Sequence, residues 1–112
     1  MGKSHLEETF EVNWEYRYPD IDLEAEYRFH SVRKFRFDFA HPGVKVAIEC
    51  QGGIWTKSGH SSGNGLKSDY EKFCLAAACG WLVFPMYEDM LKDDYWLALV
   101  AEAIRDRARV QN

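Results

Sequence analysis

The sequence has little of what would mark a secreted, membrane-spanning or zinc-stabilised protein. Its three cysteines, Cys50, Cys74 and Cys79, are odd in number and form no C-x-x-C pair, and its four histidines are scattered. Neither a disulfide framework nor a structural zinc site is therefore expected. No apolar run reaches the length of a membrane span, and the first residues lack the hydrophobic core of a secretion signal. We expect a soluble, cytoplasmic protein with buried, reduced thiols.

The sequence also lacks linkers, internal repeats and low-complexity tracts. Its 112 residues are 46% hydrophobic and 15% aromatic. This composition suits one aromatic-rich core, and the length is too short for two. We expect a single domain over residues 1–112.

Charge is unevenly distributed along the chain. The formal net charge is −4, yet residues 28–72 contain eight Lys or Arg against four Asp or Glu, a local net charge of +4. A basic centre around a few acidic residues is typical of sites that handle phosphodiesters, because cations bind the backbone while carboxylates bind a metal. The alternative is a solvated strand surface with outward-pointing Lys and Arg.

Two neighbouring predicted strands each contain one isolated carboxylate. In residues 35–40, alternation places Phe35, Phe37 and Phe39 on one face and Asp38 on the other; in residues 44–51, Glu49 and Gln51 lie on the polar face. Asp38, Glu49 and Gln51 are therefore expected to share a face. Carboxylate oxygens that converge on a sheet suit a hard divalent cation such as Mg²⁺.

The remaining patterns predict an α/β fold with a mixed central sheet flanked by helices. A helix over about 4–18 begins at Ser4, with Glu7 as its capping-box partner. Three strands then form a meander, followed by a glycine-dense loop, a helix, a short apolar strand that we expect beside the central strand and buried on both faces, and a last helix. The expected ranges are 23–29, 35–40 and 44–51 for the meander, 52–65 for the loop, 68–79 for the helix, 81–84 for the strand and 88–107 for the last helix.

This order of elements resembles the PD-(D/E)XK nuclease superfamily, whose fold is restriction-endonuclease-like. The resemblance rests on Asp38, on the run Glu49-Cys50-Gln51 with the following glycine pair, and on the later Asp69-x-x-Lys72 helix. It covers about Phe10 to Met90. The small single-domain members related to the very-short-patch repair and DUF559-type endonucleases are the most similar branch, and such small members often occur in bacteriophages and mobile elements.

The resemblance implies a metal site. Asp38 and Glu49 would bind Mg²⁺ or Mn²⁺, and the main-chain carbonyl of Cys50 would be a further ligand. Gln51 stands where the family most often has lysine, and an amide can hydrogen-bond but cannot act as a cation or base at neutral pH. The positive charge that this lysine would supply would come instead from Lys72, or in part from His60. The alternative for Lys72 is an exposed pair with Asp69.

The family also commonly uses a carboxylate from its first helix. Glu11 fits this role best, with Glu8 and the strand residue Glu26 as further candidates, and solvated side chains are the alternative for each. Phosphate contacts are expected from Arg28, Arg33 and Arg36, and base stacking from Trp55, which could equally be a core residue.

Other chemistries fit the sequence less well. The run from Gly63 to Ser68 departs from the phosphate-binding loop pattern, because a leucine separates its last glycine from the lysine. Cys50 with His60 could form a nucleophilic pair, but Cys50 falls on the apolar side of its strand, so inert burial is favoured. Alternation toward a helix-covered core explains the three phenylalanines better than a base-stacking platform does.

We therefore expect a metal-dependent DNA endonuclease, with branched, nicked or mismatched DNA as candidate substrates. A homodimer or a partner protein would lengthen the DNA footprint, an inference from size alone. The chief alternative is a catalytically silent DNA-binding or assembly module on the same scaffold, and a nuclease for RNA is the third possibility.

Overall fold

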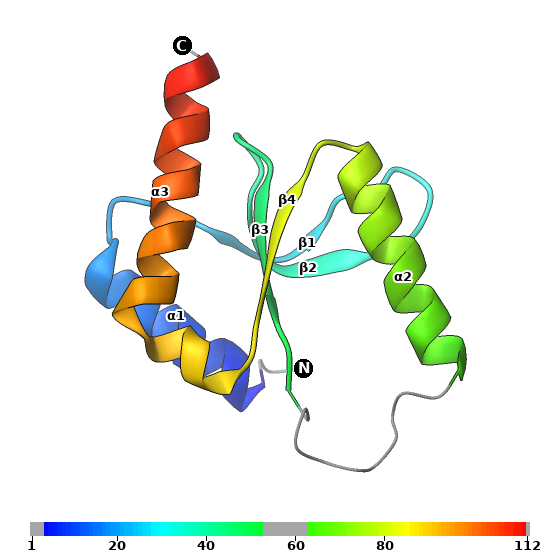
Figure 1. Ribbon diagram of the computed structural model, residues 1–112, viewed down its shortest axis with the longest axis horizontal. Helices are drawn as coiled ribbons and strands as arrows, with labels where there is room; N and C mark the ends of the chain where they lie inside the picture. Colours follow the sequence, from blue (N-terminus) through cyan, green and yellow to red (C-terminus); the bar gives the residue numbers. More distant parts are fainter. Residues whose placement is uncertain (1–3, 53–62, 112) are drawn as a thin grey trace.

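The computed structural model describes residues 4–52 and 63–111, and within them the order of elements is the expected one (Figure 1). The elements are α1 (His5–Arg17), β1 (Glu24–Arg28), β2 (Arg36–His41), β3 (Val46–Cys50), α2 (Gly63–Ala78), β4 (Leu82–Met86), the 3-10 helix η1 (Glu88–Lys92) and α3 (Asp94–Gln111).

The four strands form one mixed sheet in the order β1-β2-β3-β4. The first three pair antiparallel as a meander, and β4 runs parallel to β3. Figure 1 shows α1 and α3 on one side of this sheet and α2 on the other. The structure thus confirms an α/β fold with a mixed sheet flanked by helices.

The larger core lies between the sheet and the α1–α3 side. The capping box at the start of α1 is present: Ser4 Oγ accepts from the Glu7 backbone N–H, and Glu7 Oε1 accepts from the Ser4 backbone N–H. Phe10 and Trp14 follow at helical spacing and are buried, and the Trp14 indole N–H donates to the Ile21 carbonyl at 2.9 Å. These contacts fix α1 against the sheet with its N-terminus beside β2 and β3.

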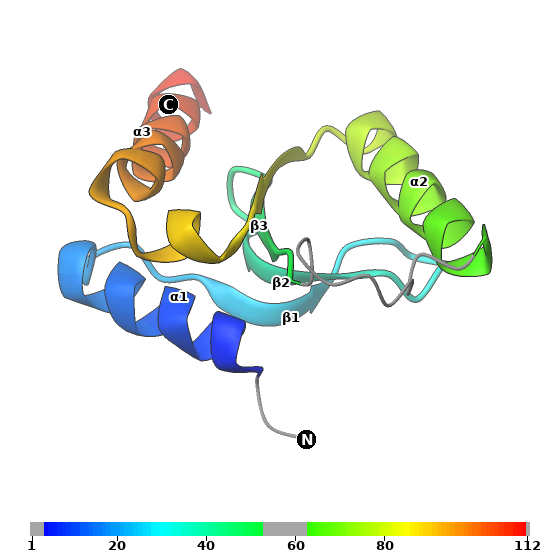
Figure 2. The same cartoon turned by 60° about the horizontal axis from the view of Figure 1, so that its bottom comes forward.

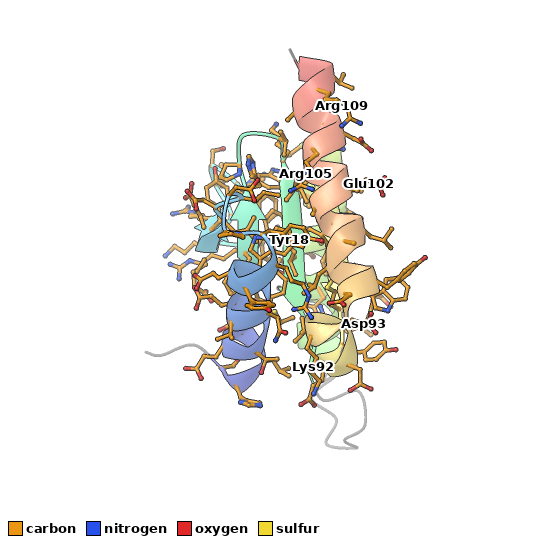
Figure 3. All side chains as sticks on the ribbon, turned by 90° about the vertical axis from the view of Figure 1, so that its left-hand side faces the viewer. Tyr18, Lys92, Asp93, Glu102, Arg105 and Arg109 are labelled. Atoms are coloured by element: carbon orange, nitrogen blue, oxygen red, sulfur yellow. The ribbon has the colours of Figure 1, made fainter. Side chains whose placement is uncertain are left out.

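Helix α3 packs on the same side of the sheet as α1, with η1 in contact with both helices. Leu97, Val100 and Ile104 of α3 are buried in the larger core. At the surface the Arg105 guanidinium lies 5.5 Å from the ring centroid of Tyr18, and both residues are labelled in Figure 3. Helices α1, η1 and α3 therefore cover this face of the sheet together.

A smaller core lies under α2 and overturns the expected face of one phenylalanine. Phe37 stacks on Phe29, with ring centroids 4.2 Å apart, and packs with Trp81 beneath α2. Phe39, two residues later, belongs to the larger core on the other side. Phe35 is only partly buried and lies under the Arg33 guanidinium. The three rings therefore do not share a face, because strand alternation is interrupted at Asp38.

Three further expectations need correction. Helix α2 begins at Gly63, five residues before the predicted start, so the capping-box pattern at Ser68 lies inside it. The expected last helix is divided into η1 and α3 at Asp93, whose carboxylate accepts from the Tyr95 backbone N–H. Strand β4 lies beside β3 but at an edge of the sheet and only partly buried, and such an edge accommodates Pro85, which has no N–H to donate.

The cysteines are free, as expected, but they are not all buried. Cys50 and Cys79 are half-buried, whereas Cys74 is exposed on α2. Among the described helices, none is both long enough and apolar enough to cross a membrane.

Candidate metal centre

The pairing of β2 with β3 changes character at Asp38 and Glu49. Regular partners run from His41 opposite Val46 to Phe39 opposite Ile48. Beyond them, the Asp38 backbone N–H donates to Glu49 Oε2 at 3.0 Å, and the Cys50 backbone N–H donates to Asp38 Oδ2 at 2.7 Å. Each carboxylate thus satisfies an N–H of the neighbouring strand, and the two side chains are fixed in the gap between the strands.

Glu49 is held from the α2 side. Among the described residues, Glu49 is the charged residue that is buried, with only 6% of its surface exposed. Lys72 Nζ lies 2.6 Å from Glu49 Oε1. Lys72 comes from α2, and its ammonium also lies 5.6 Å from the Phe37 ring centroid. Lys72 therefore pairs with Glu49, and not with Asp69 as the alternative of an exposed ion pair would have it.

Asp38 is surrounded from the α1 side by two further carboxylates. One ligand oxygen from each of Glu7, Glu26 and Asp38 lies within 4.8 Å of the other two. Glu26 has a backbone φ of 52°, and its neighbours on β1 pair with Phe37 and Phe39, so it stands opposite Asp38. A left-handed conformation is uncommon for glutamate and is often found at functional sites.

This crowding of carboxylates changes their proton affinity. Burial, the nearby charge of Glu49 and the hydrogen bond with Glu7 raise the pKa of Asp38 to about 7, although the Cys50 N–H opposes the shift. Burial and the charge of Glu7 likewise raise the pKa of Glu26. Like charges held this close favour either a shared proton or a bound cation.

The first-helix carboxylate that lies beside Asp38 is Glu7, one turn before Glu11, whose expected role stays a prediction. Glu11 lines a separate cavity of about 90 Å³ with Phe10 and Trp14, and Glu8 is exposed. Sequence reasoning assigned Glu7 only to the capping box, but its side chain serves both Ser4 and Asp38. The sequence offered one sign of this role: Glu7 lies four residues before Glu11 and therefore on the same face of the helix.

Gln51 lies toward the α2 side and not with the three carboxylates. Its backbone N–H donates to the Met86 carbonyl at 2.8 Å, and it lines a cavity of about 490 Å³ with Asp69, Phe73 and Trp81. The expected shared polar face of Asp38, Glu49 and Gln51 is therefore divided: Asp38 contacts α1, whereas Glu49 contacts α2 and Gln51 lines a cavity beside it.

Two other predicted residues can be placed, and two cannot. Arg33 is bound to Glu71 at 2.7 Å. Burial raises the pKa of the Cys50 thiol, which fits an inert side chain and not a nucleophile. Trp55 and His60 lie outside the described residues, so their expected roles stay predictions.

Comparison with known proteins relates the whole of this architecture to one catalytic domain. No family model and no curated protein matches the sequence. Among solved structures, the catalytic domain of the homing endonuclease I-Bth0305I is similar, with a TM-score of 0.55 and 18% sequence identity, over 97% of this chain and 92% of that one. At this identity the likeness shows a shared fold, so the chain has the fold of a homing endonuclease catalytic domain.

Proposed function

We propose that this protein is a divalent-metal-dependent nuclease that hydrolyses DNA phosphodiester bonds. The observation that carries the proposal is the pair of crossed hydrogen bonds between Asp38 and Glu49, which fixes two carboxylates beside Glu7 and Glu26. The fold shared with a homing endonuclease catalytic domain supports it.

The donor set fits Mg²⁺ or Mn²⁺. All the side-chain donors are carboxylate oxygens, which hard cations prefer. Burial and, after it, the negative charge of Glu49 raise the pKa of Asp38, and a bound cation would offset both effects. One oxygen from each carboxylate lies within 4.8 Å of the other two, so the three side chains could hold one cation if they moved closer together. When bound, such a cation supplies Lewis-acid chemistry by polarising the phosphoryl oxygen and offsetting charge on the leaving oxygen.

The other residues of the site position groups around this centre. Glu49 is oriented by the Asp38 N–H and by Lys72, so its carboxylate is held in place. Lys72 supplies the positive charge that a lysine at position 51 would supply, from α2 instead of β3, and offsets charge on the phosphoryl oxygens. Gln51 can orient an attacking water through its amide but cannot deprotonate it. The Cys50 carbonyl stays a predicted further ligand.

The second candidate function is a catalytically silent DNA-binding or assembly module. Gln51 favours it, because the position lacks the basic group that the resemblance leads us to expect. Cleavage of RNA is a further alternative. The single-domain organisation, the homodimer or partner protein and the preference for branched, nicked or mismatched DNA also stay predictions.

Incubating the purified protein with supercoiled plasmid tests the proposal. We expect nicking in Mn²⁺ or Mg²⁺ and none in EDTA, with the activity lost in Asp38→Asn and in Glu49→Gln. Glu102→Gln is the matched control, because Glu102 is an exposed carboxylate on the outer surface of α3 (Figure 3).

The same assay separates the alternatives. DNA binding without nicking in any metal would support the silent module. Nicking that survives in Asp38→Asn would contradict the assigned centre. Running the series on a structured RNA shows which nucleic acid is hydrolysed faster.

A further inference from the structure

Two arginines stand directly opposite each other where β1 ends and β2 begins. Arg28 pairs in register with Arg36, and both side chains are exposed. Like charges opposite each other on paired strands destabilise a sheet. Such a pair therefore costs stability, unless an anion binds between them.

The pair lies on the same face as the carboxylates. Tyr27 and Phe37 pack beneath α2, so their strand neighbours Arg28 and Arg36 point to the opposite side of the sheet. That side also carries Glu26, whose pKa the positive charge of Arg36 lowers against the larger effects of burial and Glu7. Figure 2 shows that α1 begins near the middle of the sheet, whereas β1 and β2 extend past it toward α2.

Neither arginine is occupied by a carboxylate. Among the ion pairs of the described residues, Arg33 is bound to Glu71, but Arg28 and Arg36 have no acidic partner within 4.0 Å. Arg28 makes only a long contact, 3.5 Å, to the Val32 carbonyl. Both guanidinium groups are therefore available to an anion, whereas Arg33 is not.

We propose that Arg28 and Arg36 bind the phosphate next to the one that is hydrolysed, so that the site requires a nucleic-acid strand with at least two successive phosphates. This inference rests on the proposed nuclease function and gives it a substrate requirement. Arg36 is two residues from Asp38, roughly 6.6 Å along the strand, which is close to the spacing of successive phosphates in a nucleic-acid strand. A guanidinium pair binds phosphate oxygens through charge-assisted hydrogen bonds.

The test measures DNA binding by the full chain in Ca²⁺. Fluorescence anisotropy of a labelled duplex gives the affinity at salt concentrations from about 50 to 200 mM. We expect the double variant Arg28→Gln/Arg36→Gln to bind at least about tenfold more weakly, and its salt slope to fall by about 1, for one lost phosphate contact. Arg105→Gln/Arg109→Gln is the control: it removes the same charge from α3 (Figure 3) and should bind as the wild type does.

Thermal melting separates binding from folding. Removing two opposed charges should leave the melting temperature of Arg28→Gln/Arg36→Gln unchanged or higher. Unchanged DNA affinity in this variant, with a wild-type protein that nicks plasmid, would overturn the second phosphate site and leave the nuclease intact. A wild-type protein that neither binds nor nicks DNA would overturn both. If Arg105→Gln/Arg109→Gln weakened DNA binding as much as Arg28→Gln/Arg36→Gln, the loss of affinity would follow from net charge alone. That result would contradict the proposal.

Discussion

At the two ends of the β2–β3 pair, side chains of opposite charge form hydrogen bonds with backbone groups. At the Val44 end, Arg107 Nη1 donates to the backbone carbonyls of Val44, Lys45 and Gly80 at 3.0–3.1 Å, and the Lys45 carbonyl also accepts from the Leu82 backbone N–H. At the Asp38 end, two backbone N–H groups need acceptors, and the carboxylates of Asp38 and Glu49 supply them.

The difference lies in what remains after these bonds form. Within the described part of the chain, the hydrogen bonds of Arg107 go to backbone carbonyl oxygens, so this end serves stability. Asp38 and Glu49 bring more negative charge than two N–H groups and Lys72 can offset, because Glu7 and Glu26 stand beside them. Unbalanced negative charge that the fold holds in place favours a bound cation, so we propose the function at that end of the strand pair.

The largest expected effect comes from Asp38→Asn. Nicking activity should fall by about 10³-fold or more, because the amide cannot replace a ligand carboxylate. At pH 7.5 and without metal the variant should nevertheless melt at a higher temperature than the wild type, since it removes one of several crowded charges and keeps an acceptor for the Cys50 N–H. A variant that loses activity only by unfolding would contradict this.

The next largest effect is expected for Lys72→Met. Losing the cation should lower the nicking rate by about 10²-fold. It should also destabilise the fold by about 3 kcal/mol, because Glu49 would be left buried without its partner. Denaturant unfolding of the double variant Glu49→Gln/Lys72→Met tests this explanation. Its free energy of unfolding should return toward the wild-type value, whereas its nicking activity should stay low.

The opposite end should respond through stability alone. Arg107→Met removes the donor to three carbonyls and should lower the free energy of unfolding by about 2 kcal/mol, or the melting temperature by about 8 °C. Nicking activity per folded molecule should stay at the wild-type level below the transition. A selective loss of activity would break the contrast between the two ends.

A further expected effect is a pH dependence of the metal-free protein. The pKa of Asp38 rises from 3.8 to about 7 in the fold, so the folded state binds more protons than the unfolded state between these values. Stability should therefore decline as pH rises from about 4 to about 7. Melting curves should show this decline in the wild type, a weaker one in Asp38→Asn, and none of it when saturating Mn²⁺ is present.

Local patterns were enough to predict most of the fold. The capping box at Ser4 and the limits of most strands depend on neighbours in sequence, whereas β4 pairs with β3 across 36 residues of chain. The separation of Phe37 from Phe39 was not predictable in this way, because it depends on the interrupted ladder at Asp38 and on the left-handed Glu26 across from it. The early start of α2 was missed because glycines at positions 63 and 65 favour a loop, and propensity is a weak prior.

The site was predictable where one residue has one role. Asp38 and Glu49 were named from their strand positions, and Lys72 as a helix cation that could replace the charge missing at Gln51. The structure brings the three side chains together, and their roles stay predictions. Glu7 was missed because its capping role already explained it, and a carboxylate with two oxygens can serve two partners. The choice among Glu8, Glu11 and Glu26 needed the tilt of α1 on the sheet, which a sequence pattern does not contain.

The central claim is that the Asp38 end of the sheet binds a divalent cation, and calorimetric titration of Mn²⁺ tests it without any substrate. We expect saturable binding to the wild type and to Glu102→Gln, accompanied by proton release near neutral pH, and no such binding to Asp38→Asn. Binding of Mn²⁺ to Asp38→Asn with wild-type affinity would contradict the account.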